Sequence, residues 1–260
     1  MARLRLLTFN IAHARGLSLH QGLRVPAQFR HQLLKIARLI VRVEADIVAL
    51  QEIDENSRWS GSFDHLQFLR DHTGLPHSIH GVNNRLAGSY HLNYGNGILS
   101  RWPFVHSENV PFGQKRIGGK GFLFVEINHP QGRLPLLDLH LDHRSRPHRL
   151  RQAQRLMRFL DEVRGRRAAH WRMPPILCGD LNNPAHWPDA TAVLLGYLEE
   201  RHDYMLLPKS GHGSRTFPSP WPQRSLDFVF LPATGGAVHT EVVRSMLSDH
   251  RPVLVEFNLA

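Results

Sequence analysis

Eight short apolar runs constrain the fold of this chain more than any other feature of its sequence. They are rich in Val, Ile, Leu and Phe and are bounded by Gly, Pro, Asn or Asp, as β-strands are. The runs cover residues 4–9, 47–50, 97–99, 122–127, 134–139, 176–178, 226–231 and 253–257. Because several of them follow one another with no helical segment between, we expect mainly antiparallel pairing rather than a strictly alternating α/β fold.

Two longer segments have the apolar spacing of amphipathic helices. The apolar faces are predicted to carry Phe29, Leu33, Ile36, Ile40 and Val43 in the first helix, and Leu150, Ala153, Met157 and Leu160 in the second. Shorter helices are predicted over residues 63–72, ended by Gly74, and over residues 189–195, ended by Gly196. Helices with one apolar face each are suited to covering the outer faces of two packed sheets.

The chain shows no repeat and no low-complexity linker, so we expect one domain spanning residues 1–260. Segments 74–97 and 209–224 are dense in Gly, Pro, Ser, Asn and His and are interpreted as long functional loops. No apolar run reaches the ~18 residues that a membrane span requires, and the first residues lack a signal-peptide pattern. We therefore expect a cytoplasmic monomer without integral membrane association, and the single cysteine, Cys178, excludes an intramolecular disulfide.

The net charge is +10, from 32 Lys and Arg against 22 Asp and Glu, with 19 His in addition. Such a surface favours a phosphate-containing polyanion as partner, nucleic acid being one candidate and phospholipid headgroups another. A solvated basic surface with no specific partner is an equally good interpretation. Among the arginines that follow the run at 134–139, Arg144 is our candidate for substrate binding, with Arg146 and Arg149 beside it.

Carboxylates and amides follow the apolar runs. Glu52 comes at the end of the run at 45–50, where its carboxylate suits a hard cation such as Mg²⁺, or else begins an acidic loop. Asp180 and Asn182 follow the run at 176–178 on one face of an extended backbone. Asp180 could take a proton from an attacking water, and the Asn182 amide could hold that water or a phosphoryl oxygen. Alternatively, the two residues could form an Asx turn before Pro184.

Histidines accompany these acids. Asp138, His140 and Asp142 share one strand face, and His140 could contact a phosphate oxygen; a zinc site with His143 is disfavoured because no further ligand motif completes it. His250 needs a carboxylate to hold its tautomer, and Asp227 is the better candidate because Asp249 would point away from it in an extended segment.

Asp249 is then free to approach a metal ion. The amide of Asn10, at the end of the first run, could assist the metal, and Asn96 in a glycine-flanked turn could donate to a phosphate. For both segments, an ordinary turn is the competing interpretation.

Taken together and in this order, the segments resemble the endonuclease/exonuclease/phosphatase superfamily of DNase I-like enzymes. The resemblance spans residues 6–257 and rests on Asn10, Gln51-Glu52, Asp180-x-Asn182, Leu226-Asp227 and Ser248-Asp249-His250. It implies an α+β fold, a four-layer α/β/β/α sandwich of two mixed, mainly antiparallel sheets.

The same resemblance implies Mg²⁺, with Mn²⁺ as the alternative, held chiefly by Glu52 with Asn10 and Asp249 assisting. It makes Asp180 the base for water and Asn182 its partner. It places His250, oriented by Asp227, at the phosphoryl oxygen, and His140 at a further phosphate contact. The strand that leads to His140 is most similar to the corresponding strand of small bacterial members of the family. Cys178 and Ser225 depart from the pattern of inositol-polyphosphate 5-phosphatases, which argues against that activity.

The leading hypothesis is a divalent-metal-dependent phosphoesterase that hydrolyses a phosphodiester by direct attack of water. Two alternatives are a phosphodiesterase acting on lipid headgroups at a membrane surface, and a non-catalytic, arginine-driven nucleic-acid-binding protein on the same scaffold. The second alternative leaves the joint presence of Asp180, Asp227 and His250 without a purpose.

Overall fold

A computed structural model describes residues 3–113, 117–233 and 238–259 of the chain, and within these residues two six-stranded sheets pack face to face. The first sheet has the order β11 (Val238–Val242), β12 (Val253–Asn258), β1 (Arg3–Asn10), β2 (Ile47–Asp54), β4 (Leu92–Ser100), β3 (His77–Leu86). The second has the order β5 (Phe104–Pro111), β6 (Gly121–His129), β7 (Gly132–His140), β8 (Ile176–Asp180), β10 (Asp227–Pro232), β9 (Tyr204–Leu207). Within each sheet one central pair, β1–β2 or β7–β8, is parallel and the other pairs are antiparallel, which confirms two mixed, mainly antiparallel sheets.

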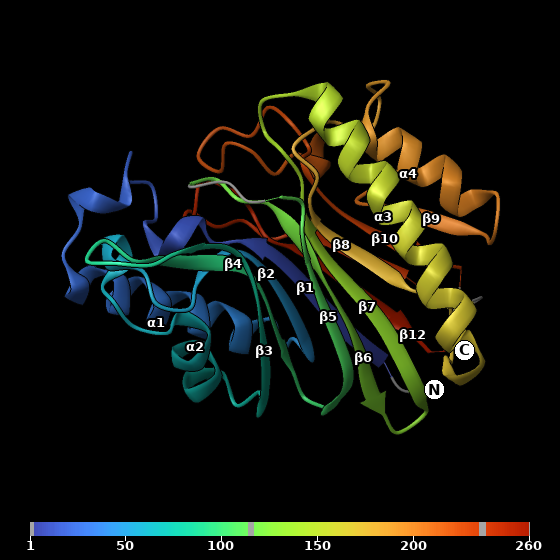
Figure 1. The fold of residues 1–260 in the computed structure, drawn as a ribbon, viewed down its shortest axis with the longest axis horizontal. Helices are drawn as coiled ribbons and strands as arrows, with labels where there is room; N and C mark the ends of the chain where they lie inside the picture. Colours follow the sequence, from blue (N-terminus) through green and yellow to red (C-terminus); the bar gives the residue numbers. More distant parts are fainter. Residues whose placement is uncertain (1–2, 114–116, 234–237, 260) are drawn as a thin grey trace.

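Helices cover both outer faces of this pair of sheets (Figure 1). α1 (Pro26–Arg42) and α2 (His65–Thr73) pack on the first sheet, and α3 (Arg146–Arg167) and α4 (Ala190–Glu199) pack on the second. Single 3₁₀ turns occupy Ala12–Ala14, Gln21–Leu23, Arg58–Ser60, Ala168–His170 and His212–Ser214. The four-layer α/β/β/α sandwich is therefore confirmed. Among the described residues, no helix is long and apolar enough to cross a bilayer.

Strand alternation divides the buried side chains between three layers of core. In β1, Leu4 and Leu6 face the second sheet, whereas Leu7 and Phe9 face the helices. In β8, Cys178 faces between the sheets while its neighbour Leu177 packs under α3 and α4. Because successive side chains of a strand point to opposite faces, any polar residue two positions beyond an inter-sheet residue also lies between the sheets.

Three expectations about the elements were wrong. Segment 74–97 is not a loop: most of it forms the β3–β4 hairpin, whose strand β3 is polar because it lies at a sheet edge. Gly196 does not end a helix, since α4 continues to Glu199 and buries Leu198 against the same core as Leu194. The buried face of α3 is centred on Leu156 and Leu160 with Phe159 and Val163, so it is rotated from the predicted one.

Candidate active site

Two rows of polar residues face each other where the two sheets meet at one rim. In the second sheet, His140, Asp180 and Asp227 are directly paired across β7, β8 and β10. In the first sheet, Asn10 is paired with Gln51 across β1 and β2. All have the parity of the inter-sheet core, so their side chains converge on the space between the sheets instead of on the helices.

Glu52 reaches the site through a β-bulge. By strict alternation it would point toward the helices, because Gln51 before it faces between the sheets. Instead the register of β2 against β4 shifts between Gln51 and Ile53, and Glu52 has a φ of +53°. A non-glycine residue with this backbone conformation is strained, and bulges that redirect a side chain are typical beside active sites.

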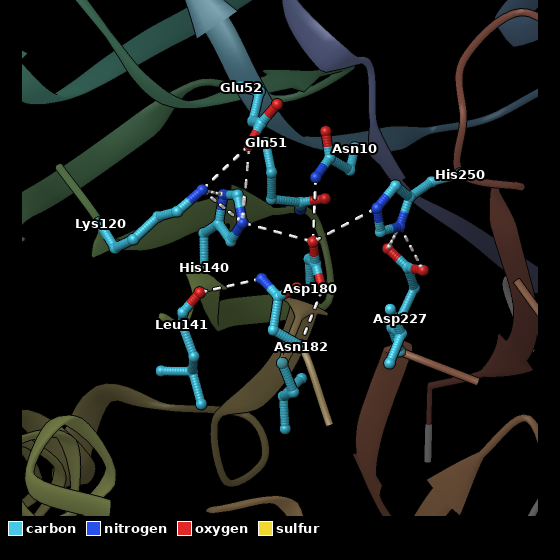
Figure 2. A network of polar contacts seen from close by, with 12 residues as sticks. Asn10, Gln51, Glu52, Lys120, His140, Leu141, Asp180, Asn182, Asp227 and His250 are labelled. Carbon is cyan, nitrogen blue, oxygen red and sulfur yellow. Dashed lines mark hydrogen bonds and ion pairs between the residues drawn. The ribbon is translucent and has the colours of Figure 1, made fainter. Parts of the chain in front are cut away.

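Asp180 stands at the centre of the contacts that Figure 2 shows. Its Oδ2 accepts a hydrogen bond of 2.9 Å from Asn10 Nδ2, and lies 3.3 Å from His140 Nε2 and 3.7 Å from His250 Nε2. Its Oδ1 accepts from the backbone N–H of Asn182 at 2.9 Å. Burial alone would raise the pKa of Asp180, but the charge of His250 and the hydrogen bonds outweigh it and hold that pKa well below its usual range. Asp180 is therefore an ionised carboxylate in a buried position.

His250 lies between two carboxylates. Its Nδ1 is 2.9 Å from Asp227 Oδ2, while its Nε2 faces Asp180. Burial alone would lower the pKa of His250, but Asp227 and Asp180 outweigh it and raise that pKa to about 10. The shared proton therefore resides on the imidazole, with Asp227 behind it and the cleft in front.

Asn182 has a left-handed backbone, with a φ of +56°, which turns its side chain back toward the rim. Its Nδ2 donates to the carbonyl of Leu141 at 2.9 Å. With the amide nitrogen held there, the Asn182 side-chain oxygen is available to accept a hydrogen bond.

Lys120 belongs to the site and escaped the sequence analysis. Its Nζ lies 3.0 Å from Glu52 Oε1 and 2.8 Å from His140 Nε2 (Figure 2). Burial alone would raise the pKa of Glu52, but Lys120 and His13 hold it well below its usual range, and burial together with Lys120 lowers the pKa of His140. The one signal available in the sequence was a lysine between two glycines directly before an apolar run, in Gly119-Lys120-Gly121.

A second Asp–His pair, also unforeseen, lies beside Glu52. His13 Nδ1 is 2.9 Å from the buried Asp54 Oδ2, and His13 Nε2 is 3.7 Å from Glu52 Oε2. Trp59 Nε1 donates to the other oxygen of Asp54 at 3.0 Å. His13 lies in a turn of three consecutive non-glycine residues with positive φ, Ala12 to Ala14. A strained turn of this kind is maintained only by strong surrounding contacts.

The remaining predicted residues take different places. Asp249 lines the cleft and forms an ion pair with Arg15. Asn96 is fully buried beneath the cleft, where it donates to the carbonyl of Asp138 at 3.1 Å. Arg144 is exposed, and its Nε donates to His143, which lines the cleft.

Arg149 does not face solvent or substrate, contrary to our expectation for it. It is buried in an ion pair with Asp189, the N-cap of α4, and donates to the carbonyl of Asp142 at 3.1 Å. It thus holds α3 against the start of α4.

The site opens into a cleft of about 470 Å³ lined by residues from both sheets and from segment 11–21. Glu52, Asn10 and Asp249, which line it, offer two carboxylates and an amide oxygen, the donor set that a hard divalent cation prefers. The Asn10 oxygen accepts from Ala12 N–H and keeps a second lone pair. These three residues fit a divalent cation.

Asp180, Asp227 and His250 are a second possible donor group, because their ligand atoms lie within 4.8 Å of one another. A cation bound there would have to displace the proton of His250, whose pKa the two carboxylates raise. The described residues thus offer two candidate donor groups for a cation, Glu52 with Asn10 and Asp249, and Asp180 with Asp227 and His250.

Comparison with known proteins places the chain among related sequences and folds. A model described as the Endonuclease/Exonuclease/phosphatase family matches residues 7–250. The uncharacterized protein YbhP of Escherichia coli strain K12 is 27% identical over 257 residues, covering 94% of each chain.

Solved structures share the fold. An endonuclease/exonuclease/phosphatase from Beutenbergia cavernae superposes with a TM-score of 0.71 at 22% identity, over 100% of this chain and 72% of its own. Sphingomyelinase C from Streptomyces griseocarneus gives 0.64 at 20% identity, and Danio rerio TDP2 complexed with a single-strand DNA product gives 0.65 at 18%; each comparison covers 99% of this chain and 100% of the other.

Proposed function

Because this chain belongs to the endonuclease/exonuclease/phosphatase family, we propose that it is a divalent-metal-dependent phosphodiesterase that uses direct attack of water. The observation that carries the proposal is the position of Asp180. One buried carboxylate contacts Asn10 at the end of β1, His140 at the end of β7 and His250 in the segment before β12. A structural carboxylate needs one good partner, whereas this one gathers three side chains at the floor of an open cleft.

In the proposed reaction, water attacks phosphorus while the bond from phosphorus to the leaving oxygen breaks. Asp180 accepts a proton from this water, and the side-chain oxygen of Asn182 accepts a hydrogen bond from the other O–H of the water. Direct attack forms no covalent enzyme intermediate. Because Asp180 is a weak base with its lowered pKa, the activation of water must be shared with other groups of the site.

His250 donates from Nε2 to a non-bridging phosphoryl oxygen, whose negative charge grows as water attacks. Asp227 holds the ring through Nδ1 and stabilises its protonated form. Lys120 and His140 contribute further donors on the opposite side of Asp180, so the phosphoryl group is bound between two sets of donors.

Glu52, Asn10 and Asp249 would hold the cation, Mg²⁺ or Mn²⁺. When bound, such an ion lowers the pKa of water and stabilises charge on the phosphoryl and leaving oxygens. Lys120 and Arg15, the present partners of Glu52 and Asp249, would share these carboxylates with the ion.

The substrate class we favour is nucleic acid, in keeping with the net charge of +10. One observation supports a second candidate, the headgroup of a lipid at a membrane surface. Leu19 and Ile117 line the cleft and yet are strongly exposed, as side chains that contact a lipid surface would be. Faster hydrolysis of sphingomyelin in vesicles than of any oligonucleotide would select that candidate.

The proposal is tested with Asp180→Asn and His250→Gln on bis-p-nitrophenyl phosphate in the presence of Mg²⁺. Each variant should lose at least about 100-fold in kcat, since each removes a group that acts in the transition state. Unchanged thermal unfolding shows that the fold persists. Wild-type rates in both variants, or salt-sensitive nucleic-acid binding with no metal-dependent hydrolysis of any phosphoester, would contradict it.

A further inference from the structure

A second cavity, of about 320 Å³, lies beside the proposed catalytic cleft and takes no part in the chemistry described above. It is formed where the loop after β8 meets the segment that leads into β10. Its lining includes Arg215, Arg224, His186 and Trp187, and among the described residues that line it there is no aspartate or glutamate.

The two cavities are joined by a continuous line of side chains. The Phe217 ring, which lines the catalytic cleft, packs 4.9 Å from the His250 ring. Arg224 Cζ lies 5.4 Å from the Phe217 centroid, and Arg224 lines the second cavity. These two distances limit the separation of the Arg224 guanidinium and the His250 ring to about 10 Å.

The segment that carries these groups is fastened to the catalytic histidine. Phe217 and Arg224 are bridged by backbone hydrogen bonds, so residues 216–225 form a closed turn. Arg251 N–H donates to the carbonyl of Thr216 at 2.8 Å, and Ser219 N–H donates to the carbonyl of Asp249 at 2.7 Å. The second cavity is thus held in a set position relative to His250.

Charge and aromatic surface occur together there. Arg215 and Arg224 are exposed, and arginine binds phosphate bidentately. Trp187 in the lining is 43% exposed, and Trp221 at the tip of the same turn is 79% exposed. Cationic groups track a phosphate backbone and exposed aromatic rings stack on unpaired bases, which is the combination typical of single-strand binding sites.

We propose that this second cavity is a subsite for the single-stranded nucleic acid that flanks the scissile phosphodiester. Arg224 and Arg215 bind the phosphates that follow it, and Trp187 stacks on a base. Because the separation of Arg224 and the His250 ring is at most about 10 Å and successive phosphates advance at least about 3.4 Å, Arg224 lies within reach of a phosphate up to about three positions along the strand. The inference rests on the proposed phosphodiesterase function, and narrows its substrate to single strands.

The test measures binding separately from catalysis. A short fluorescein-labelled oligothymidylate is titrated in EDTA and followed by fluorescence anisotropy at several salt concentrations. Arg215→Ala/Arg224→Ala should weaken binding by about tenfold or more and reduce the slope of log Kd against log salt by about 1.4, from two contacts at about 0.7 each. Trp187→Ala should weaken binding by about tenfold and leave that slope unchanged.

The matched control is Arg38→Ala/Arg42→Ala, which removes the same charge from exposed positions of α1. All variants should keep wild-type kcat and KM on bis-p-nitrophenyl phosphate, which is too small to reach the second cavity. Equal binding losses in the two double variants, or no loss in Arg215→Ala/Arg224→Ala, overturns the subsite.

The two proposals fail in distinguishable ways. A wild-type protein that hydrolyses bis-p-nitrophenyl phosphate but binds only vesicles, or only duplex DNA, overturns the subsite and leaves the phosphodiesterase standing. Suppose instead that the wild-type protein hydrolyses no phosphoester, with or without added metal, and that Arg215→Ala/Arg224→Ala weakens binding of the oligonucleotide. That result overturns the phosphodiesterase and leaves a single-strand binding site at the second cavity.

Discussion

Asp227→Asn is the substitution that examines the proposed site most directly. Asp227 and His250 are 1% and 6% exposed, and the carboxylate lies 2.9 Å and 3.2 Å from His250 Nδ1. Removing one charge of such a buried pair costs about 3–5 kcal/mol, and asparagine, which keeps one acceptor oxygen, should fall at the lower end. If the loss is expressed in the transition state, kcat falls about 10²- to 10³-fold, since about 1.36 kcal/mol is tenfold.

The assay is steady-state hydrolysis of bis-p-nitrophenyl phosphate at saturating Mg²⁺. Because Asp227 acts through His250 and does not touch the substrate, kcat should fall while KM stays near the wild-type value. Asp203→Asn, the same change at an exposed position, is the control and should leave both constants unchanged. A kcat within about threefold of wild type, a difference below about 0.7 kcal/mol, would refute the role given to this pair.

Three further outcomes are expected. EDTA should abolish hydrolysis, and Mg²⁺ or Mn²⁺ should restore it; activity that persists in EDTA contradicts the cation site. In Gly179→Ala, with φ at +138°, the new Cβ would stand 1.9 Å from the Leu139 carbonyl oxygen, so β8 must separate from β7. Its Tm should fall sharply in differential scanning calorimetry, while Gly165→Ala, which has open space, should not lower it. Burial alone would raise the pKa of Glu126, but hydrogen bonds from Arg167 and Trp171 outweigh it and lower that pKa. This stabilisation is therefore present above about pH 4.5 and is lost as pH falls further. Urea unfolding should show Glu126→Gln less stable by about 1.5–3 kcal/mol at pH 7 and less sensitive to acid; equal acid sensitivity in both proteins would contradict this.

The strands that the sequence predicts, and those that it conceals, divide by their place in the sheets. All eight apolar runs correspond to interior strands of the two sheets. The four concealed strands, β3, β5, β9 and β11, are the four sheet edges within the described residues. An interior strand is covered on both faces and paired on both sides, so it is nearly all apolar. An edge strand is paired on one side only and is partly solvated, so β3, β5 and β11 mix polar with apolar residues and resemble loops. The remaining edge strand, β9, is apolar but only four residues long.

The candidate site shows a similar division. Asn10, Asp180 and Asp227 are recognisable because each extends the inter-sheet parity of an apolar run to the rim. Lys120 and His13 are not recognisable in this way. Lys120 reaches Glu52 from the start of β6 and His13 reaches it from a strained turn, so both positions depend on tertiary packing. The burial of Arg149 depends in the same way on where the start of α4 places Asp189.

By itself, the sequence determined which segments are buried and which chemical groups end them, because strand alternation and apolar content are local properties of the chain. The tertiary structure decided which of those groups meet. The bulge at Glu52, the pairing of His140, Asp180 and Asp227 across three strands, and the turn that joins Phe217 to His250 all bring together residues far apart in sequence. Distances of this kind depend on strand register and sheet packing, which involve both partners at once and are therefore not written in either segment alone.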